Sequence, residues 1–192
     1  MYIRVEKNRM GELELADGCR RGDNNARREL YERYAGRMLA LCQRYVGSRE
    51  EAEDLLHDGF LKLYSSFDKF TWRGEGSLRA WMERVMVNEA LQYLRRNDVL
   101  GQSAPLDALP LEAYDAPEPE TVEQIPQQVL LKFISELPAG YRTVFNLYVF
   151  EGKSHKDIAQ LLGINEKSSA SQLARGKAAL AAKVREWVRK NE

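Results

Sequence analysis

Residues 154–165 read SHKDIAQLLGIN, and this stretch decides the fold of the C-terminal part of the chain. Ser154 and Asp157 stand three residues apart, the spacing of a capping box at a helix start. Gly163 suits the left-handed backbone of a turn, and Asn165 is a good N-cap for a following helix. The pattern predicts a helix over 155–162, a turn at 163–165 and a second helix from Lys167 to about Lys190.

The apolar residues of this stretch fit two short helices that cross closely. Ala159 is small where the two helices must approach each other. The residues expected to fill the small core are Ile158, Leu161, Leu162 and Ile164. The stretch therefore predicts a helix-turn-helix that places its second helix in a DNA major groove.

The first turns of the second helix are small, polar and basic. Gln172 is suited to pair with adenine, and the serines can bond bases or phosphates. The predicted DNA contacts of this helix are Lys167, Ser168, Ser171, Gln172, Arg175 and Lys177. The alternative is a plain helical hairpin with a solvated face. It is less favoured because the Ala159–Gly163 spacing and the polar, basic helix occur together.

Residues 99–126 differ in composition from the rest of the chain. They hold six acidic residues, no basic ones and five of the six prolines. Proline removes a backbone donor, so a packed helix is not expected here, and we interpret the segment as an extended acidic linker. The predicted domains are thus 1–98 and 127–192. A surface loop within one domain is the alternative, although loops of this length are uncommon in compact domains.

The flanking segments have helical patterns, and strand alternation is nearly absent. A long amphipathic run covers 24–45, and Ser48 with Glu51 fits a second capping box. Behind that box the apolar stripe is Leu56, Phe60, Leu63 and Phe67. Ser77 is expected to cap a helix through about Asn97. The fold class predicted is all-α: a bundle of three or four helices, the linker and a helix-turn-helix domain.

Composition excludes several classes of protein. The chain is 44% hydrophobic and 30% charged and has no apolar run of membrane-span length, so we expect a cytoplasmic protein outside the membrane. Cys19 and Cys42 are interpreted as buried thiols. His57 and His155 lack neighbouring metal ligands, so neither a metal nor another cofactor is expected. We find no nucleophile–base set or phosphate-binding loop, and no enzyme is predicted.

The helix from Ser77 carries an uneven polar face. Arg84, Asn88 and Arg95 fall on one side, with Trp81 close by, and the aromatic, basic and glycine-containing loop 67–77 precedes them. Such groups suit single-stranded DNA, because rings hold flipped bases and arginines follow phosphates. Periodicity alone favours a different interpretation over DNA binding: Trp81 belongs to the core, and the arginines form a solvated face.

The order of the motifs resembles one family. The N-terminal motifs are Leu30-Tyr31-Glu32-Arg33-Tyr34, residues 52–60, Phe70 with residues 74–81, Asn88, and Leu94-Arg95-Arg96. Together they resemble the sigma-2 domain of the extracytoplasmic-function (ECF) sigma factors of bacterial RNA polymerase. Residues 137–177 resemble the sigma-4 domain of the same family.

The resemblance implies a role for each set. The polymerase-binding residues would be Asp54, Leu55, Asp58 and Phe60. The residues at the promoter −10 element would be Phe70, Arg73, Trp81, Arg84, Asn88, Arg95 and Arg96. The second helix of the helix-turn-helix would read the −35 element, and the acidic linker would run through the RNA exit path. The implied partners are core RNA polymerase, promoter DNA and an anti-sigma factor, with a chain that is monomeric when free or bound to anti-sigma.

Some positions depart from the family pattern. His57 stands where glutamine is common, which is expected to alter docking detail, and Thr71-Trp72 is an insertion in a usually shorter loop. Ala170 and Gln172 stand where a basic residue is frequent, which leaves −35 preference open. The expected function is a sigma factor that recruits polymerase and opens the −10 region. The alternative is a freestanding helix-turn-helix regulator that dimerises on a palindrome.

Overall fold

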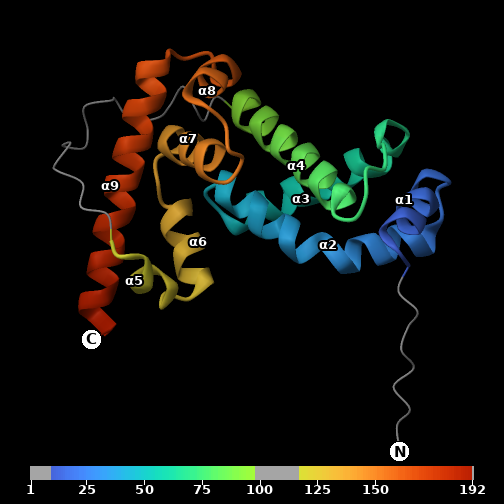
Figure 1. Ribbon diagram of the computed structural model, residues 1–192, viewed down its shortest axis with the longest axis horizontal. Coiled ribbons are helices and arrows are strands. Elements are labelled where there is room, and N and C mark those ends of the chain that lie inside the picture. The colour runs from blue at the N-terminus through green and yellow to red at the C-terminus, as the bar shows by residue number, and fades with distance from the viewer. Residues whose placement is uncertain (1–9, 98–116, 192) are drawn as a thin grey trace, which may run out of the picture. The chain divides into compact units, whose positions relative to one another are not determined.

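The computed structural model describes residues 10–97 and 117–191, and within these ranges it contains helices and no strand (Figure 1). The helices are α1 (Glu12–Arg20), α2 (Asn24–Tyr45), α3 (Arg49–Tyr64), the 3-10 turn η1 (Phe67–Lys69), α4 (Ser77–Arg96), α5 (Pro119–Glu123), α6 (Gln127–Ser135), α7 (Ala139–Val149), α8 (His155–Leu162) and α9 (Glu166–Asn191). The all-α prediction is confirmed.

The chain forms two compact units, which we describe separately. Unit 1 contains residues up to 42 and 53–89, and unit 2 contains 43–52 and everything from 90 onward. The predicted division into 1–98 and 127–192 is a different partition and stays a prediction. Residues 99–116 of the predicted linker lie outside the described part of the chain.

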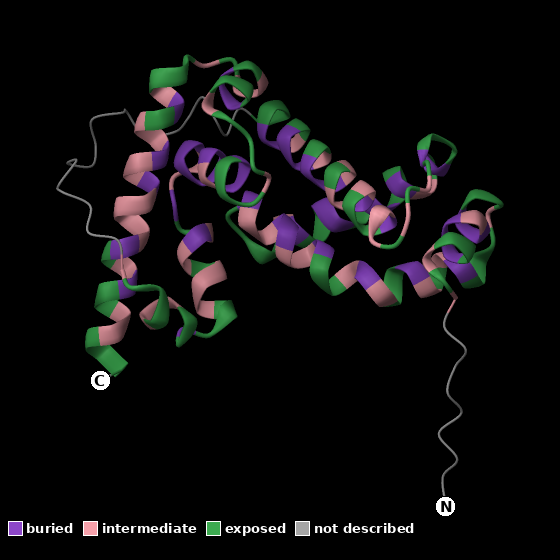
Figure 2. Cartoon of the chain, viewed as in Figure 1, coloured by how far each residue is buried: buried purple, intermediate pink, exposed green. Residues whose placement is uncertain are grey.

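The core of unit 1 is built on the predicted stripe of α3. Leu56, Phe60 and Leu63 are buried, as is Phe67, which belongs to η1 rather than to the helix. Gly59 lets α3 approach α4, because a Cβ there would lie 2.2 Å from Sδ of Met86. Figure 2 shows buried segments alternating with exposed ones along α4.

Helix α4 begins at its predicted cap residue, Ser77, and not at the residue after it. Ser77 is the first helical residue, and its hydroxyl accepts a hydrogen bond of 3.3 Å from the backbone N–H of Arg73. The expectation that Ser77 caps the helix is therefore wrong, because its hydroxyl binds the preceding loop instead. On the core side of α4, Leu78, Met82 and Met86 are fully buried.

The end of the predicted linker contains a helix that the sequence did not suggest. Helix α5 spans only Pro119–Glu123 and buries none of its residues. Proline stands at its first position, where the missing N–H has no partner to lose. The expectation of an extended linker is therefore wrong for these five residues. Their acidic character agrees with the predicted composition of the linker.

Within unit 2, buried polar side chains of α7 form hydrogen bonds with the end of α2. The guanidinium of Arg142 on α7 is buried, and its Nε donates to the backbone oxygen of Tyr45 at 3.0 Å. Asn146, one turn later, donates from Nδ2 to the backbone oxygen of Arg44 at 2.6 Å. These two side chains satisfy carbonyls at the last turn of α2, which the helix itself leaves unpaired.

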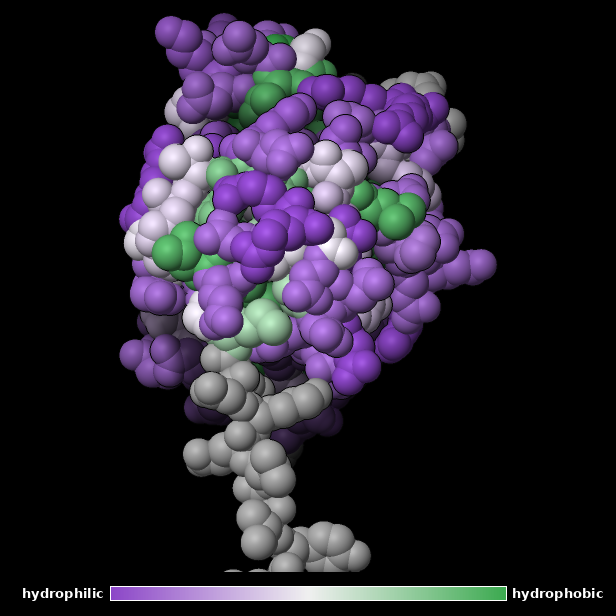
Figure 3. Space-filling view, turned by 90° about the vertical axis from the view of Figure 1, so that its right-hand side faces the viewer, coloured by the Kyte–Doolittle hydropathy of each residue, from purple (hydrophilic) through white to green (hydrophobic). Residues whose placement is uncertain are grey.

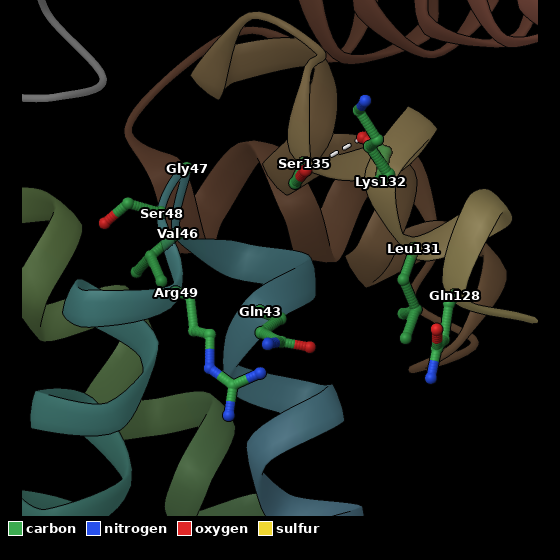
Figure 4. Close-up of a pocket in the computed structure, with 9 residues that line it drawn as sticks. All are labelled: Gln43, Val46, Gly47, Ser48, Arg49, Gln128, Leu131, Lys132 and Ser135. Carbon is green, nitrogen blue, oxygen red and sulfur yellow. Dashed lines mark hydrogen bonds between the residues drawn. The ribbon is translucent and has the colours of Figure 1, made fainter.

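A pocket of about 360 Å³ lies in unit 2 beside the same turn (Figure 4). Its walls come from residues 43–49 and from α6, where the hydroxyl of Ser135 donates to the backbone oxygen of Lys132 at 2.8 Å. None of the residues predicted to contact DNA or polymerase lines it.

Candidate nucleic-acid interface

The helix-turn-helix forms as its sequence predicts. The Ser154 hydroxyl accepts from the Asp157 N–H at 3.2 Å, and the Asp157 carboxylate accepts from the Ser154 N–H at 3.2 Å. Helix α8 ends at Gly163, whose φ of 68° is left-handed. The Asn165 side chain then accepts from the N–H of Ser168 at 2.7 Å, so the predicted N-cap of α9 is confirmed. At both helix starts, side chains therefore satisfy backbone N–H groups that the helices leave unpaired.

The apolar residues of this motif divide into two groups. Ile158 and Ala159 are buried, whereas Leu161, Leu162 and Ile164 are half-buried. The prediction that all four large residues fill the core therefore holds fully only for Ile158. Leu161, Leu162 and Ile164 therefore remain partly in contact with solvent in the chain alone.

A polar contact that was not expected joins the two helices. Nδ1 of His155 lies 2.9 Å from Oγ of Ser169, whose side chain is completely buried. The His155 ring stacks on Tyr148 with centroids 4.8 Å apart, and Nζ of Lys177 lies 5.7 Å from the centre of the same Tyr148 ring. Ser169 is therefore a support of α9 and, contrary to the sequence-based expectation for the serines of this helix, does not face DNA.

The predicted −35 residues lie along one helix, α9, with different degrees of exposure. Lys167 is exposed, while Ser168, Ser171, Gln172, Arg175 and Lys177 are half-buried. An open surface hollow at the start of the helix is lined by Asn165, Glu166, Lys167, Ser168 and Ser171. Arg175 differs from the others, because its Nε and Nη1 are buried and make no hydrogen bond. These two nitrogens could reach a phosphate only if the Arg175 side chain rearranged.

The predicted −10 residues divide between the two units. Phe70, Arg73, Trp81, Arg84 and Asn88 belong to unit 1, whereas Arg95 and Arg96 at the end of α4 belong to unit 2. Arg84 and Asn88 are exposed and one turn apart on α4. Arg95 donates to the backbone oxygen of Leu161 at 2.5 Å, and Arg96 donates to Oε1 of Gln92 at 2.9 Å.

Trp81 lies in an aromatic cluster at the start of α4. Its ring is half-buried, 5.0 Å from the ring of Phe67 and 5.3 Å from that of Phe70. Phe70 is itself buried, so it packs beneath the loop that follows it. Loop residues 71–76 are exposed or half-buried. The cluster thus supports the loop and leaves the side chains of Thr71, Trp72 and Arg73 to face outward or partly outward.

The predicted polymerase-binding residues differ in their exposure to solvent. Asp54 and Asp58 are exposed and one turn apart on α3. Leu55 and Phe60 are buried, and the Phe60 ring lies 4.7 Å from that of Tyr31. Only the two carboxylates are available to a partner, while the two apolar residues hold α3 to its own unit.

Comparison with known protein families covers both parts of the chain. The family model Sigma-70 region 2 matches residues 30–99, and the model Sigma-70, region 4 matches residues 127–180. A relative in Haemophilus influenzae, named ECF RNA polymerase sigma-E factor, is 32% identical over 157 residues, which is 77% of this chain and 82% of the relative. The chain belongs to the ECF sigma factors.

Two further relatives carry the same name. Proteins of the same name from Escherichia coli K12 and from Salmonella typhimurium LT2 are each 26% identical, covering 92% of this chain and 95% of their own length. A solved structure described as "Structure of CnrH in complex with the cytosolic domain of CnrY" matches with 19% identity and a TM-score of 0.44, covering 93% of this chain and 97% of that chain. As a sigma factor, the chain directs promoter recognition in bacterial transcription initiation, together with RNA polymerase.

Helix α1 of this sigma factor contributes contacts that its sequence did not signal. Glu12 and Arg20 each bond the backbone at one end of loop 70–76. Both residues precede the part of the chain that matches region 2. Only their spacing along a nine-residue helix with opposite charges at its ends could have drawn attention to them.

The described residues also bear on other classes of site. Among residues 10–97 and 117–191, no group of three or more His, Cys, Asp and Glu side chains could hold a metal ion. In the same part of the chain no helix combines the length and the apolar character needed to cross a membrane. Cys19 and Cys42 are free and buried, as predicted, and burial raises the pKa of Cys19 to about 11 and that of Cys42 to about 12.

Proposed function

We propose that this sigma factor docks on core RNA polymerase through α3, captures −10 bases with α4 and loop 70–76, and reads the −35 element with α9. The observation that carries the proposal is the capped turn between α8 and α9. It fixes a helix whose polar, partly exposed first turns include Lys167, Ser168 and Ser171.

The −35 reading by α9 would be modest in affinity when the chain is alone. Of the predicted phosphate contacts on this helix, only Lys167 is exposed. Each phosphate neutralised adds to binding and to its salt dependence, so few contacts give weak binding. Sequence preference would come from Gln172, Ser168 and Ser171, with Ala170 exposed where a basic residue is frequent in the family.

The −10 reading would combine loop 70–76 with the exposed face of α4. Arg84 and Asn88 lie on that face, and the half-buried Trp81, held by the buried rings of Phe67 and Phe70, offers a partly exposed ring on which a flipped base can stack. The face shown in Figure 3 is mostly hydrophilic, with small separate hydrophobic areas. Capture of unpaired bases would offset the few kcal/mol that unpairing costs.

Docking on polymerase would use the carboxylates of Asp54 and Asp58, with His57 exposed between them. Leu55 and Phe60 would act indirectly by holding α3 in place. The division into domains 1–98 and 127–192 is supported by the two family matches, which stop and restart on either side of the acidic segment.

Several further features belong to the same proposal. The chain performs no catalysis of its own, acts in the cytoplasm as a monomer and requires no cofactor. An anti-sigma factor is proposed as a partner. The acidic segment would follow the RNA exit path of polymerase.

Reconstitution with core polymerase tests the proposal most directly. The purified chain is combined with core enzyme on a genomic fragment library, and run-off transcripts are mapped. A shared −10 and −35 pattern upstream of the starts is expected. Protection of a palindromic operator by the chain alone, with no stimulated transcription, would instead show a freestanding regulator.

A further inference from the structure

Loop 70–76 is bonded at both of its ends by the same short helix, α1. At the first end, Nη2 of Arg20 donates to the backbone oxygen of Phe70 at 3.1 Å. At the other end, Oε2 of Glu12 accepts from the backbone N–H of Gly76 at 2.8 Å. We call Glu12 and Arg20 the α1 clamp.

Both clamp residues are themselves held in place. The other carboxylate oxygen of Glu12 accepts from the hydroxyl of Tyr34 at 3.0 Å, and Tyr34 is buried on α2. Nη1 of Arg20 donates to the carboxylate of Asp17 at 2.6 Å, one turn back on α1. Each side chain is oriented by a second partner, so it presents a fixed group to the loop.

The loop needs this support because its own backbone is unusual. Gly74 and Gly76 have φ values of 104° and 83°, a region that side-chain-bearing residues rarely adopt. Glycine also leaves the unfolded loop with more freedom to lose, so its conformation depends on outside contacts. The hydrogen bonds at Phe70 and Gly76 restrict the positions that the two ends of the loop can take.

We propose that the α1 clamp is a positioning device for −10 base selection, in which Glu12 and Arg20 hold loop 70–76 in the shape that discriminates between bases. The inference rests on the proposed function of that loop. Glu12 and Arg20 need not touch DNA, because their effect passes through the backbone of the loop. A base pocket displaced by about 1 Å loses contact geometry on which discrimination between correct and incorrect bases depends.

The test uses the full-length chain with core polymerase, four variants on α1 and α2, and the two loop variants Trp72→Ala and Arg73→Ala. Glu12→Ala and Arg20→Ala each remove one side of the clamp. Tyr34→Phe removes the hydroxyl that orients Glu12 and keeps the buried ring. Glu14→Ala is the matched control, since Glu14 is an exposed residue in the first turn of the same helix.

Two measurements are made on each of the four variants on α1 and α2. The first is the rate of trypsin cleavage after Arg73 in the free chain, which reports the order of the loop without any reference to DNA. The second is open-complex yield on promoters that differ by one base at each −10 position. Both clamp variants should speed the cleavage and reduce base discrimination by roughly 3- to 10-fold, the effect of losing one ordering hydrogen bond. Tyr34→Phe should show a smaller change in the same direction.

The outcomes separate the inference from the proposed function. Cleavage and discrimination equal to those of Glu14→Ala would overturn the inference. If the direct loop variants Trp72→Ala and Arg73→Ala leave discrimination unchanged, the proposed function of the loop is wrong, and the inference falls with it. If the loop variants alter discrimination and the clamp variants do not, only the inference fails. Should Glu12→Ala not fold, Glu12→Gln replaces it, since the amide cannot accept both hydrogen bonds with the geometry of the carboxylate.

Discussion

Nδ1 of His155 lies 2.9 Å from Oγ of Ser169, so the first residue of α8 is bonded directly to the first turn of α9. Ser169 is completely buried, so its hydroxyl cannot bind water, and the His155 ring is the partner that satisfies it. This one contact couples the two helices of the helix-turn-helix across the turn at Gly163.

Replacing His155 with phenylalanine should destabilise unit 2. The aromatic ring against Tyr148 is kept, but the buried Ser169 hydroxyl loses its partner, at a cost of about 1–3 kcal/mol. Urea unfolding of the full chain measures the change. Adding Ser169→Ala should recover part of the loss, because the orphaned hydroxyl is removed. Strictly additive effects of the two changes would show that the contact carries no coupling.

Replacing Arg142 with methionine should destabilise unit 2 more strongly. The Arg142 guanidinium donates to the backbone oxygens of Tyr45, Ser135 and Leu137. Burial lowers the pKa of this guanidinium, and the nearby Glu51 carboxylate opposes that shift. With three carbonyls left unpaired, we expect a loss of about 2–4 kcal/mol in the free energy of unfolding. Exposed Arg79→Met is the control, and an equal effect of both variants would refute the assignment.

Glu51 gives a pH-dependent test. Burial alone would raise the pKa of its carboxyl, but hydrogen bonds from Tyr93 and Ser48 outweigh burial and lower it. The folded chain therefore holds this proton less tightly than the unfolded chain. The stabilisation is present at neutral pH and is lost as the pH falls through the lowered, folded-state pKa.

Glu51→Gln should accordingly cost about 1 kcal/mol at pH 7, the usual value of a cap. The difference from the unchanged chain should shrink as the pH falls through the lowered, folded-state pKa of Glu51, because the protonated carboxyl is then as neutral as the amide. Urea unfolding across this pH range checks the prediction, with exposed Glu50→Gln as control. A difference that persists undiminished in acid would contradict it.

Asp54→Arg should weaken binding to core polymerase. Asp54 is exposed on α3, and reversing its charge at a docking surface should lower affinity by about tenfold or more. Titration of labelled chain with core enzyme measures this. Glu14→Arg reverses an equally exposed charge on α1 and should have little effect. Undiminished binding by Asp54→Arg would remove α3 from the proposed docking surface.

Asn88→Ala should reduce promoter opening and leave polymerase binding unchanged. Asn88 is exposed on α4, so its loss should not disturb the fold. Removing a polar contact to an unpaired base should lower open-complex yield by about 5- to 100-fold, which corresponds to roughly 1–3 kcal/mol. Permanganate reactivity of −10 thymines gives the yield, and a value equal to that of the unchanged chain would reject the role.

The sequence by itself determined the local features of this sigma factor. Two capping boxes, the left-handed Gly163 and the Asn165 cap form where they were predicted. These features depend on residues three or four positions apart, so neighbouring side chains are enough to specify them. The apolar stripe Leu56–Phe60–Leu63 is correct for the same reason, because helical period sets which residues share a face.

Tertiary structure alone decided which of the polar residues are exposed, and so available to a partner, and which are buried within the fold. Ser169 and Arg175 both lie in the polar, basic first turns of α9 that were expected to contact DNA, yet Ser169 is fully buried against His155 and Arg175 has two buried guanidinium nitrogens. The α1 clamp joins residues 64 and 50 positions apart in the chain. Helical periodicity cannot specify such pairs, because the partners lie on different elements. The packing of α1 against η1 brings them together.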